Sequence, residues 1–213
     1  MAELSQTGRF ITLEGIEGVG KSTNVNFIAD YFRANGDVVH VTREPGGTEI
    51  AERIRNLILE TPGDGLSDIG ELLLMFAARS EHLAGLILPA LKRGETVICD
   101  RFVDASFAYQ GGGRGINHEV IAVLRDIVMG KLRPDLTILL DAPTEVSAER
   151  IAGREWQDRF EQEQAEFFAR VRSAYLDIAG REPDRVRIVD ASLPLAEVQA
   201  AIIEVLGKTF IYP

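Results

Sequence analysis

The chain has 213 residues, of which 46% are hydrophobic and 26% are charged, a composition typical of a soluble globular protein. Its formal net charge of −10 argues against broad nucleic-acid binding, because such binding relies on many Lys and Arg contacts to phosphates. Small anionic substrates are compatible with this charge only if the few cations gather at one site.

Several features of the sequence predict a single domain, 1–213, in the cytoplasm. No Ser/Gly/Pro-rich stretch or charge run divides the chain, and its apolar runs are too short to span a bilayer. The N-terminal residues lack the basic start and long apolar stretch of a secretory signal. The single cysteine, Cys99, cannot form an internal disulfide. It lies in an apolar run, so we expect an inert buried thiol.

Short apolar runs alternate with helical stretches along the chain. The first, 9–14, leads into a glycine-rich turn and a helix predicted from Ser22 to Asn35. The others are 38–42, 96–100, 136–141 and 186–190. Near-continuous apolar strands joined by helices imply a parallel sheet covered on both faces. The predicted fold is therefore α/β, a P-loop three-layer α/β/α sandwich with a parallel sheet of about five strands.

The glycine-rich turn fits the pattern G-x-x-x-x-G-K-[ST], directly after a predicted strand and directly before a predicted helix. Such a loop points its backbone N–H groups inward, and the following helix directs its positive end at the same point, so phosphate oxygens find ready donors. Lys21 adds a charge that can reach the β- and γ-phosphates. The residues expected to bind ATP are Gly15, Ile16, Glu17, Gly18, Val19, Gly20, Lys21, Ser22 and Thr23.

A magnesium site is expected beside this loop. The Ser22 hydroxyl suits a Mg²⁺ ligand, and Asp100 ends the third apolar run, where P-loop proteins place an acid that holds Mg²⁺. A strand-ending aspartate can also be a simple helix cap. Arg101 follows immediately and places a cation beside the metal acid, which favours the functional interpretation. The histidines, His40, His82 and His118, show no metal spacing, and no zinc site is predicted.

Four further motifs accompany the phosphate loop: Arg-Glu-Pro-Gly-Gly-Thr at 43–48, Phe-Ala-Ala-Arg at 76–79, Asp-Arg at 100–101 and Tyr-Gln-Gly-Gly-Gly-Arg-Gly at 109–115. Together they resemble bacterial thymidylate kinases, in order from about Phe10 to about Asp190. The resemblance implies ATP-dependent phosphorylation of thymidine monophosphate (dTMP) to dTDP in dTTP biosynthesis, with Mg²⁺ as cofactor. It also implies a homodimer.

The resemblance assigns an acceptor site as well. Glu17 would hold the 3′-hydroxyl of the acceptor sugar, while Arg55 and Arg101 would bind its 5′-phosphate through forked donors. Thymine would stack on Phe76, and Arg79 would donate to its O4, which cytosine replaces with an amino group. The remaining dTMP contacts implied are Glu44, Pro45, Ser106, Tyr109 and Gln110.

These assignments have plainer alternatives. Taken alone, Phe76 fits core packing and Arg55 fits a surface residue of a 48–60 helix. The glycines at 111–113 could form a flexible turn without a substrate contact.

A charged segment at about 149–160 has no clear apolar stripe and is interpreted as a lid. Family members without an arginine in the phosphate loop supply one from the lid, and residues 16–19 here contain none. Arg154, Arg159 and Arg150 are therefore the candidates to act with Lys21 and Arg101 on the transferred phosphate, Arg154 first. A solvated helix of mixed charge is the alternative for each.

Two rival functions stay open at this point. One is a kinase of the same class with another acceptor, either a different nucleoside monophosphate or a deoxynucleoside. The other is an ATP-dependent regulator; a guanine-specific switch is disfavoured because no Asn is followed by Lys.

Overall fold

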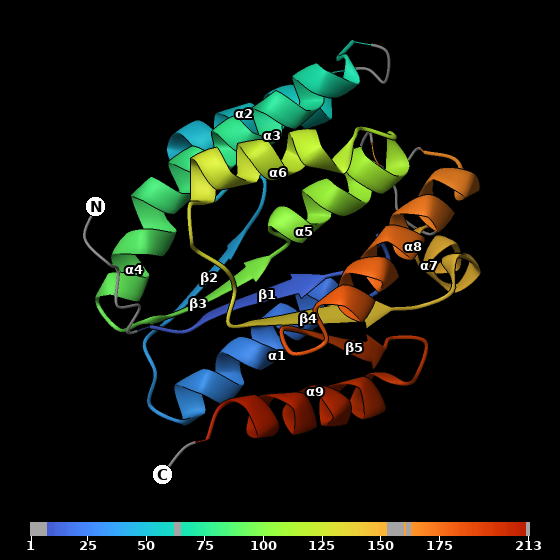
Figure 1. Ribbon diagram of the computed structural model, residues 1–213. Helices are drawn as coiled ribbons and strands as arrows, with labels where there is room; N and C mark the ends of the chain where they lie inside the picture. Colours follow the sequence, from blue (N-terminus) through green and yellow to red (C-terminus); the bar gives the residue numbers. More distant parts are fainter. Residues whose placement is uncertain (1–7, 62–64, 153–159, 161–162, 212–213) are drawn as a thin grey trace.

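The computed structural model describes residues 8–61, 65–152, 160 and 163–211. Its centre is a parallel sheet of five strands in the order β2-β3-β1-β4-β5 (Figure 1). The strands are β1 Phe10–Glu14, β2 Val39–Arg43, β3 Thr96–Asp100, β4 Leu136–Asp141 and β5 Val186–Asp190. All five predicted strands are present, and β1 and β2 each begin one residue later than the apolar run. The predicted α/β/α sandwich is confirmed.

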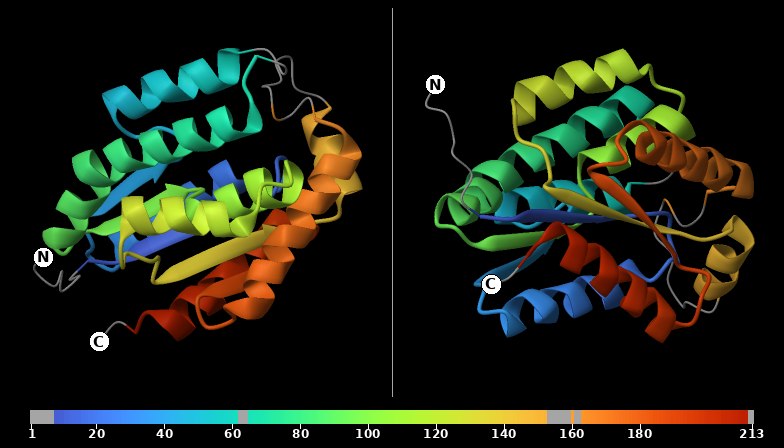
Figure 2. Two further views of the ribbon diagram at one scale, coloured as in Figure 1. Left: turned by 45° about the horizontal axis from the view of Figure 1, so that its top comes forward. Right: turned by 60° about the horizontal axis from the view of Figure 1, so that its bottom comes forward.

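Helices cover both faces of this sheet. On one face lie α1 (Lys21–Ala34) and α9 (Leu195–Thr209), and Figure 2 shows them side by side below the strands. The opposite face carries most of the remaining helical segments. They are α2 (Glu49–Glu60), α3 (Asp68–His82), η1 (Leu83–Ile87), α4 (Leu88–Lys92), α5 (Val103–Ser106), η2 (Phe107–Gly113), α6 (His118–Met129) and α8 (Ala165–Arg181), with α7 (Thr144–Ile151) following β4.

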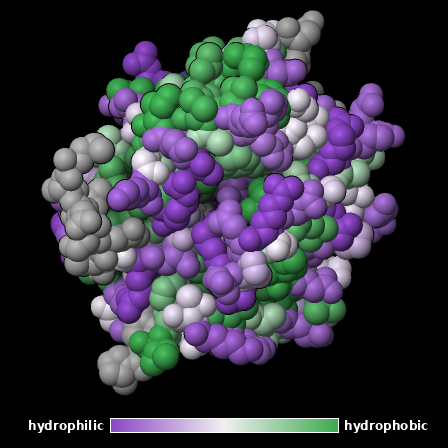
Figure 3. All heavy atoms as spheres, in the orientation of Figure 1, coloured by the Kyte–Doolittle hydropathy of each residue, from purple (hydrophilic) through white to green (hydrophobic). Residues whose placement is uncertain are grey.

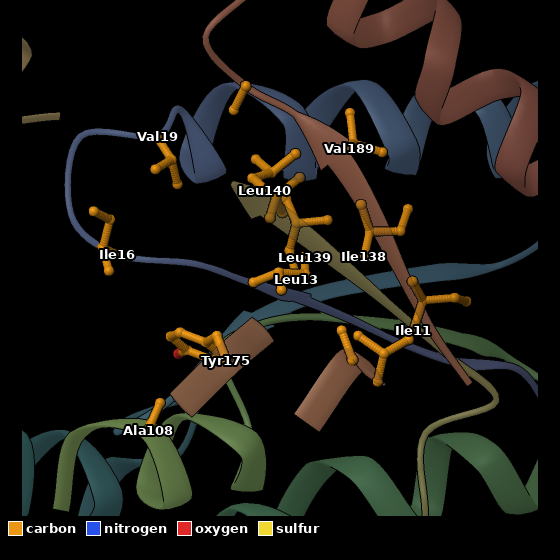
Figure 4. Packing of buried hydrophobic residues seen from close by; sticks show 14 of the residues in the cluster. Ile11, Leu13, Ile16, Val19, Ala108, Ile138, Leu139, Leu140, Tyr175 and Val189 are labelled. Carbon is orange, nitrogen blue, oxygen red and sulfur yellow. The ribbon is translucent and has the colours of Figure 1, made fainter. Parts of the chain in front are cut away.

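The core is apolar on both faces because β1 is buried throughout and β3 and β4 are buried up to their last residue. Ile11, Leu13 and Ile138 pack with α1 and α8 residues in one cluster, part of which Figure 4 shows. Phe10 lies in a second cluster, where its ring meets that of Phe102 edge to face at 4.9 Å. Cys99 is fully buried, as its apolar run predicts, and burial raises the pKa of its thiol.

The helix boundaries follow local sequence signals. Helix α1 ends at Ala34, one residue before the predicted Asn35, and Gly36 follows with φ 91°. Thr48 and Ser67 cap α2 and α3 by accepting from the backbone N–H groups of Ala51 and Gly70. These caps fix where α2 and α3 begin.

One continuous helical run, Asp68–Lys92, is long and apolar enough by length and composition to cross a membrane. Its uninterrupted apolar stretches, 72–78 and 83–91, are short, as the sequence predicts. The run carries Glu71, Arg79 and His82, all buried and hydrogen-bonded to other parts of the chain. Charged groups held in this way are typical of a core helix that borders a polar site.

Candidate active site

The phosphate loop joins β1 to α1 and is anchored by its own apolar residues. Ile16 and Val19 are buried in the main core cluster (Figure 4). Gly15 and Gly18 have φ of 135° and 79°, and a Cβ at either would lie 2.3 Å from the carbonyl oxygen of Leu140 or 2.5 Å from that of Ser147. Only glycine allows this approach to β4 and α7. The loop is thus held in one shape.

Lys21 opens α1 and curls back over the loop. Its Nζ donates to the carbonyl oxygens of Gly15 at 3.0 Å and Ile16 at 2.8 Å. Burial, and then the charge of Arg101, lower the pKa of Lys21 to about 8. A cation held inside the loop by neutral carbonyls is suited to an incoming phosphate. Gly20, Ser22 and Thr23 are exposed at the start of the same helix.

Asp100 ends β3 beside this helix start. Its Oδ1 is buried without a hydrogen-bond partner among the described residues, and a buried acceptor in that condition is costly unless something fills the site. Asp100 and Ser22 line one cavity together with Arg43 and Glu52. One hydroxyl and one carboxylate oxygen fit Mg²⁺, which keeps several waters and binds through few protein ligands.

A second cavity lies on the other side of the loop and gathers most of the residues predicted for the acceptor. Its lining consists of Glu17, Glu44, Pro45, Arg55, Leu59, Met75, Arg79, Arg101, Phe102, Ala105, Ser106, Tyr109, Gln110 and Phe160. Three guanidinium groups therefore face one space in a chain of net charge −10. Such a concentration of arginine favours an anionic ligand.

Arg101 lies where this cavity meets the phosphate loop. It donates from Nη2 to Glu17 Oε1 at 2.8 Å and from Nη1 to the Gly15 carbonyl oxygen at 2.8 Å. Tyr109 donates from its hydroxyl to the other Glu17 oxygen at 2.6 Å. Glu17 thus connects Arg101 to Tyr109, and it faces the cavity rather than the N–H groups of the loop.

Arg79 occupies the opposite end of the cavity and is held on three sides. Its Nε donates to Glu44 Oε2 at 2.7 Å, Nη1 to Ser106 Oγ at 3.1 Å and Nη2 to the Phe102 carbonyl oxygen at 3.1 Å. These contacts use three of the five N–H groups of a guanidinium. Two donors are left for a ligand in the cavity.

Glu44 is itself held by a partner that the sequence did not indicate. His82 Nδ1 lies 3.1 Å from Glu44 Oε1, and His82 Nε2 lies 2.7 Å from Thr42 Oγ1. Because a carboxylate only accepts, His82 Nδ1 is the donor to Glu44. Glu44 was expected among the dTMP contacts; its carboxylate fixes Arg79, while the residue also borders the cavity.

Of the other residues predicted to bind the acceptor, Arg55 and Gln110 line the cavity and Phe76 does not. Arg55 donates to the Pro45 carbonyl oxygen at 2.9 Å, and Gln110 donates to Glu71 at 2.8 Å; both line the cavity. Phe76 is buried in the second core cluster and does not line it. Its ring lies 4.7 Å from the Arg79 guanidinium carbon, so core packing accounts for its position.

The lid candidates are only partly described. Arg154 and Arg159 lie outside the described residues, and most of the 149–160 segment does too. Arg150 lies in the last turn of α7 and donates to the carbonyl oxygen of Ala191, just after β5, at 2.9 Å. The described contact therefore joins Arg150 to the segment directly after β5.

A phosphate loop that faces an arginine-lined cavity across the carboxyl end of a parallel sheet defines the class of P-loop kinases that act on small phosphorylated acceptors. The model of the thymidylate kinase family matches residues 13–202. The chain therefore belongs to the thymidylate kinase family.

Individual relatives agree with this family. A thymidylate kinase of Pseudomonas syringae pv. tomato is 58% identical over 202 residues, which cover 95% of this chain and 96% of the relative. One from Methylococcus capsulatus is 55% identical over 92% of this chain and 93% of the relative. The crystal structure of thymidylate kinase from Ehrlichia chaffeensis superposes with a TM-score of 0.77 at 35% identity, covering 93% of this chain and 98% of that one.

Proposed function

We propose that this chain catalyses ATP-dependent phosphorylation of dTMP to dTDP, a step in dTTP synthesis, with Mg²⁺ as cofactor. The observation that carries the proposal is the single cavity in which Arg101, Arg55 and Arg79 meet Glu17 of the phosphate loop. An acceptor in this cavity lies directly beside the loop that takes ATP. Membership of the thymidylate kinase family supports dTMP as that acceptor.

Each end of the cavity suits one end of dTMP. Arg101 uses three N–H groups on Gly15, Tyr175 and Glu17, so two donors are left for the 5′-phosphate, which Arg55 also faces. Glu17 accepts hydrogen bonds and suits the sugar 3′-hydroxyl. The two unused donors of Arg79 suit a carbonyl oxygen of thymine, and the amino group of cytosine would meet them with no acceptor.

Phosphoryl transfer needs alignment and charge compensation more than covalent help. Lys21 would neutralise charge on the transferred phosphate from inside the loop, and Arg101 would do so from the acceptor side. Mg²⁺ held by Ser22 and Asp100 would offset charge on the ATP phosphates. We assign the additional cation to Arg154 or Arg159 of a lid at about 149–160 on a single 1–213 domain.

We further propose a cytoplasmic homodimer. Three neighbouring helices on one side of the sheet, α2, α3 and α6, expose large apolar side chains, and Figure 3 shows apolar surface gathered over this side of the molecule. The exposed residues are Ile50, Leu57, Ile69, Leu73, Val120, Val123 and Ile127. Contiguous apolar surface of this kind is typical of a protein interface.

The test follows ADP formation with Mg²⁺-ATP and each of dTMP, dUMP, UMP, CMP, AMP and GMP. We expect strong preference for dTMP, and Arg79→Ala should weaken that preference, while Arg181→Ala, an exposed arginine on α8, serves as the matched control. If another nucleotide gave the fastest ADP release, the acceptor would be wrong. Slow hydrolysis that ignores all six would instead indicate an ATP-dependent regulator.

A further inference from the structure

Arg101 is the only non-glycine residue with a positive φ, 68°, in the described part of the chain. A left-handed backbone costs a side-chain-bearing residue on the order of 1–2 kcal/mol. The conformation turns the chain sharply after β3, where the Arg101 N–H donates to the Leu13 carbonyl oxygen at 2.9 Å. Surrounding groups must therefore hold both the backbone and the side chain of Arg101 in place.

Glu14, the last residue of β1, contacts the backbone beside Arg101 directly and the Arg101 side chain through a hydroxyl group. Its Oε1 accepts from the backbone N–H of Phe102 at 2.7 Å, which is the peptide directly after Arg101. Its Oε2 accepts from the Tyr175 hydroxyl at 2.7 Å. That same hydroxyl accepts from Arg101 Nη1 at 3.2 Å. One carboxyl group thus reaches the backbone after Arg101 directly and the guanidinium through one hydroxyl.

Neither Glu14 nor Tyr175 lines the acceptor cavity. Glu14 is fully buried and Tyr175 is 2% exposed, within or beside the main core cluster. A carboxyl group in such a place is costly, and burial together with the charge of Asp104 raises the pKa of Glu14 to about 8. Apolar packing alone would be served better by an apolar side chain at both positions.

We infer that Glu14 and Tyr175 are positioning residues that aim the Arg101 guanidinium at the acceptor phosphate. The inference rests on the proposed function, in which Arg101 binds that phosphate. Glu14 sets the turn of the backbone, and the Tyr175 hydroxyl, supplied by α8, sets the side chain. The two residues make no substrate contact of their own.

The test is a double-mutant cycle of Tyr175→Phe and Arg101→Ala. Tyr175→Phe deletes only the hydroxyl, so we expect kcat/KM for dTMP and dTMP binding, measured by calorimetry, each to fall about tenfold, while KM for ATP stays within twofold. In the Arg101→Ala background the same change should alter dTMP binding, measured by calorimetry, by less than twofold. Tyr31→Phe, on α1 at the other face of the sheet, is the matched control.

Three outcomes separate the alternatives. Full activity of Tyr175→Phe would overturn the inference, and so would an equal loss in the Arg101→Ala background, because Tyr175 would then act independently. Inactivity of the natural chain towards dTMP would instead overturn the proposed function. Glu14→Ala adds a second variant: it removes the acceptor for the Phe102 N–H and the partner of the Tyr175 hydroxyl, and we expect the same selective loss for dTMP.

Discussion

The buried ammonium of Lys21 sets a limit on activity at alkaline pH. Its pKa is lowered to about 8 by burial and by Arg101, so the free enzyme loses this charge as the pH rises through 8, well below the usual range of lysine. Neutral Lys21 no longer attracts the ATP phosphates. We predict that kcat/KM for ATP falls about tenfold for each pH unit above 8.

Steady-state rates between pH 7 and 9.5 check this prediction. Lys21→Arg is the informative variant, because a guanidinium stays charged over the whole range and should remove the alkaline decline even if its overall rate is low. A natural chain with constant kcat/KM up to pH 9.5 would contradict the assignment of the decline to Lys21.

Gly47 controls how the Arg79 end of the cavity is built. A Cβ at Gly47 would lie 2.4 Å from His82 Nε2 and 2.5 Å from Thr42 Oγ1. These two atoms hydrogen-bond to each other and hold the ring whose Nδ1 contacts Glu44. Gly36 has a similar φ, 91° against 88°, but nothing lies within 4 Å of its Cβ position. The pair therefore separates a steric clash from backbone strain.

We predict that Gly47→Ala lowers the free energy of unfolding by more than about 3 kcal/mol, whereas Gly36→Ala lowers it by about 1 kcal/mol. Urea denaturation measures both. Gly47→Ala protein that still folds should also lose its preference for dTMP over CMP. The displaced His82 would no longer fix Glu44, and Glu44 would no longer fix Arg79. Equal effects of the two variants would show that the contact with His82 is unimportant.

At the scale of whole elements, the stability of the fold depends most on its central strands. Ile98 lies in β3, is fully buried and pairs in register with Ile11 of β1. Ile188 lies in the edge strand β5 and is 52% exposed. We predict that Ile98→Ala costs about 2–5 kcal/mol of unfolding free energy and Ile188→Ala less than about 1 kcal/mol, as measured in urea. Similar losses would indicate that the sheet order is wrong.

Local sequence signals predicted the strands well because each strand is a short apolar run. The bounds of β3, β4 and β5 agree with the runs at 96–100, 136–141 and 186–190. The phosphate loop could also be predicted from local sequence, because eight neighbouring residues carry its pattern. The π-helical segments η1 and η2 were not predicted, because their apolar periodicity differs little from that of an α-helix.

Contacts between distant elements left no such signal. Glu14 and Tyr175 are 161 residues apart, and Gln110 meets Glu71 across 39 residues. His82 and Tyr175 belong to helical stretches whose pattern predicts only packing, so their polar partners could not be found in one sequence. The family motifs located most of the charged and polar residues that line this cavity, but not Leu59, Met75 or Phe160. The residues behind the lining required the fold.

At the scale of the whole molecule, the proposed homodimer depends on the apolar face of α2, α3 and α6. Val123 and Ile127 of α6 are 59% and 73% exposed, and Leu73 of the adjacent α3 is 51% exposed. In the proposed homodimer these side chains leave water. Helix α3 also carries Arg79 and His82, so the same helix that would form the interface holds the proposed thymine end of the acceptor site.

Val123→Asp places a carboxylate in the middle of this face, and burying it against a second copy costs several kcal/mol. We predict that the dimer dissociation constant rises at least 100-fold, measured by sedimentation equilibrium. Ile203→Asp on α9, at the other side of the sheet and 37% exposed, is the matched control and should stay dimeric. Dissociation frees α3, so KM for dTMP should rise in Val123→Asp alone. A natural chain that sediments as a monomer, or a control that dissociates equally, would exclude this face as the interface.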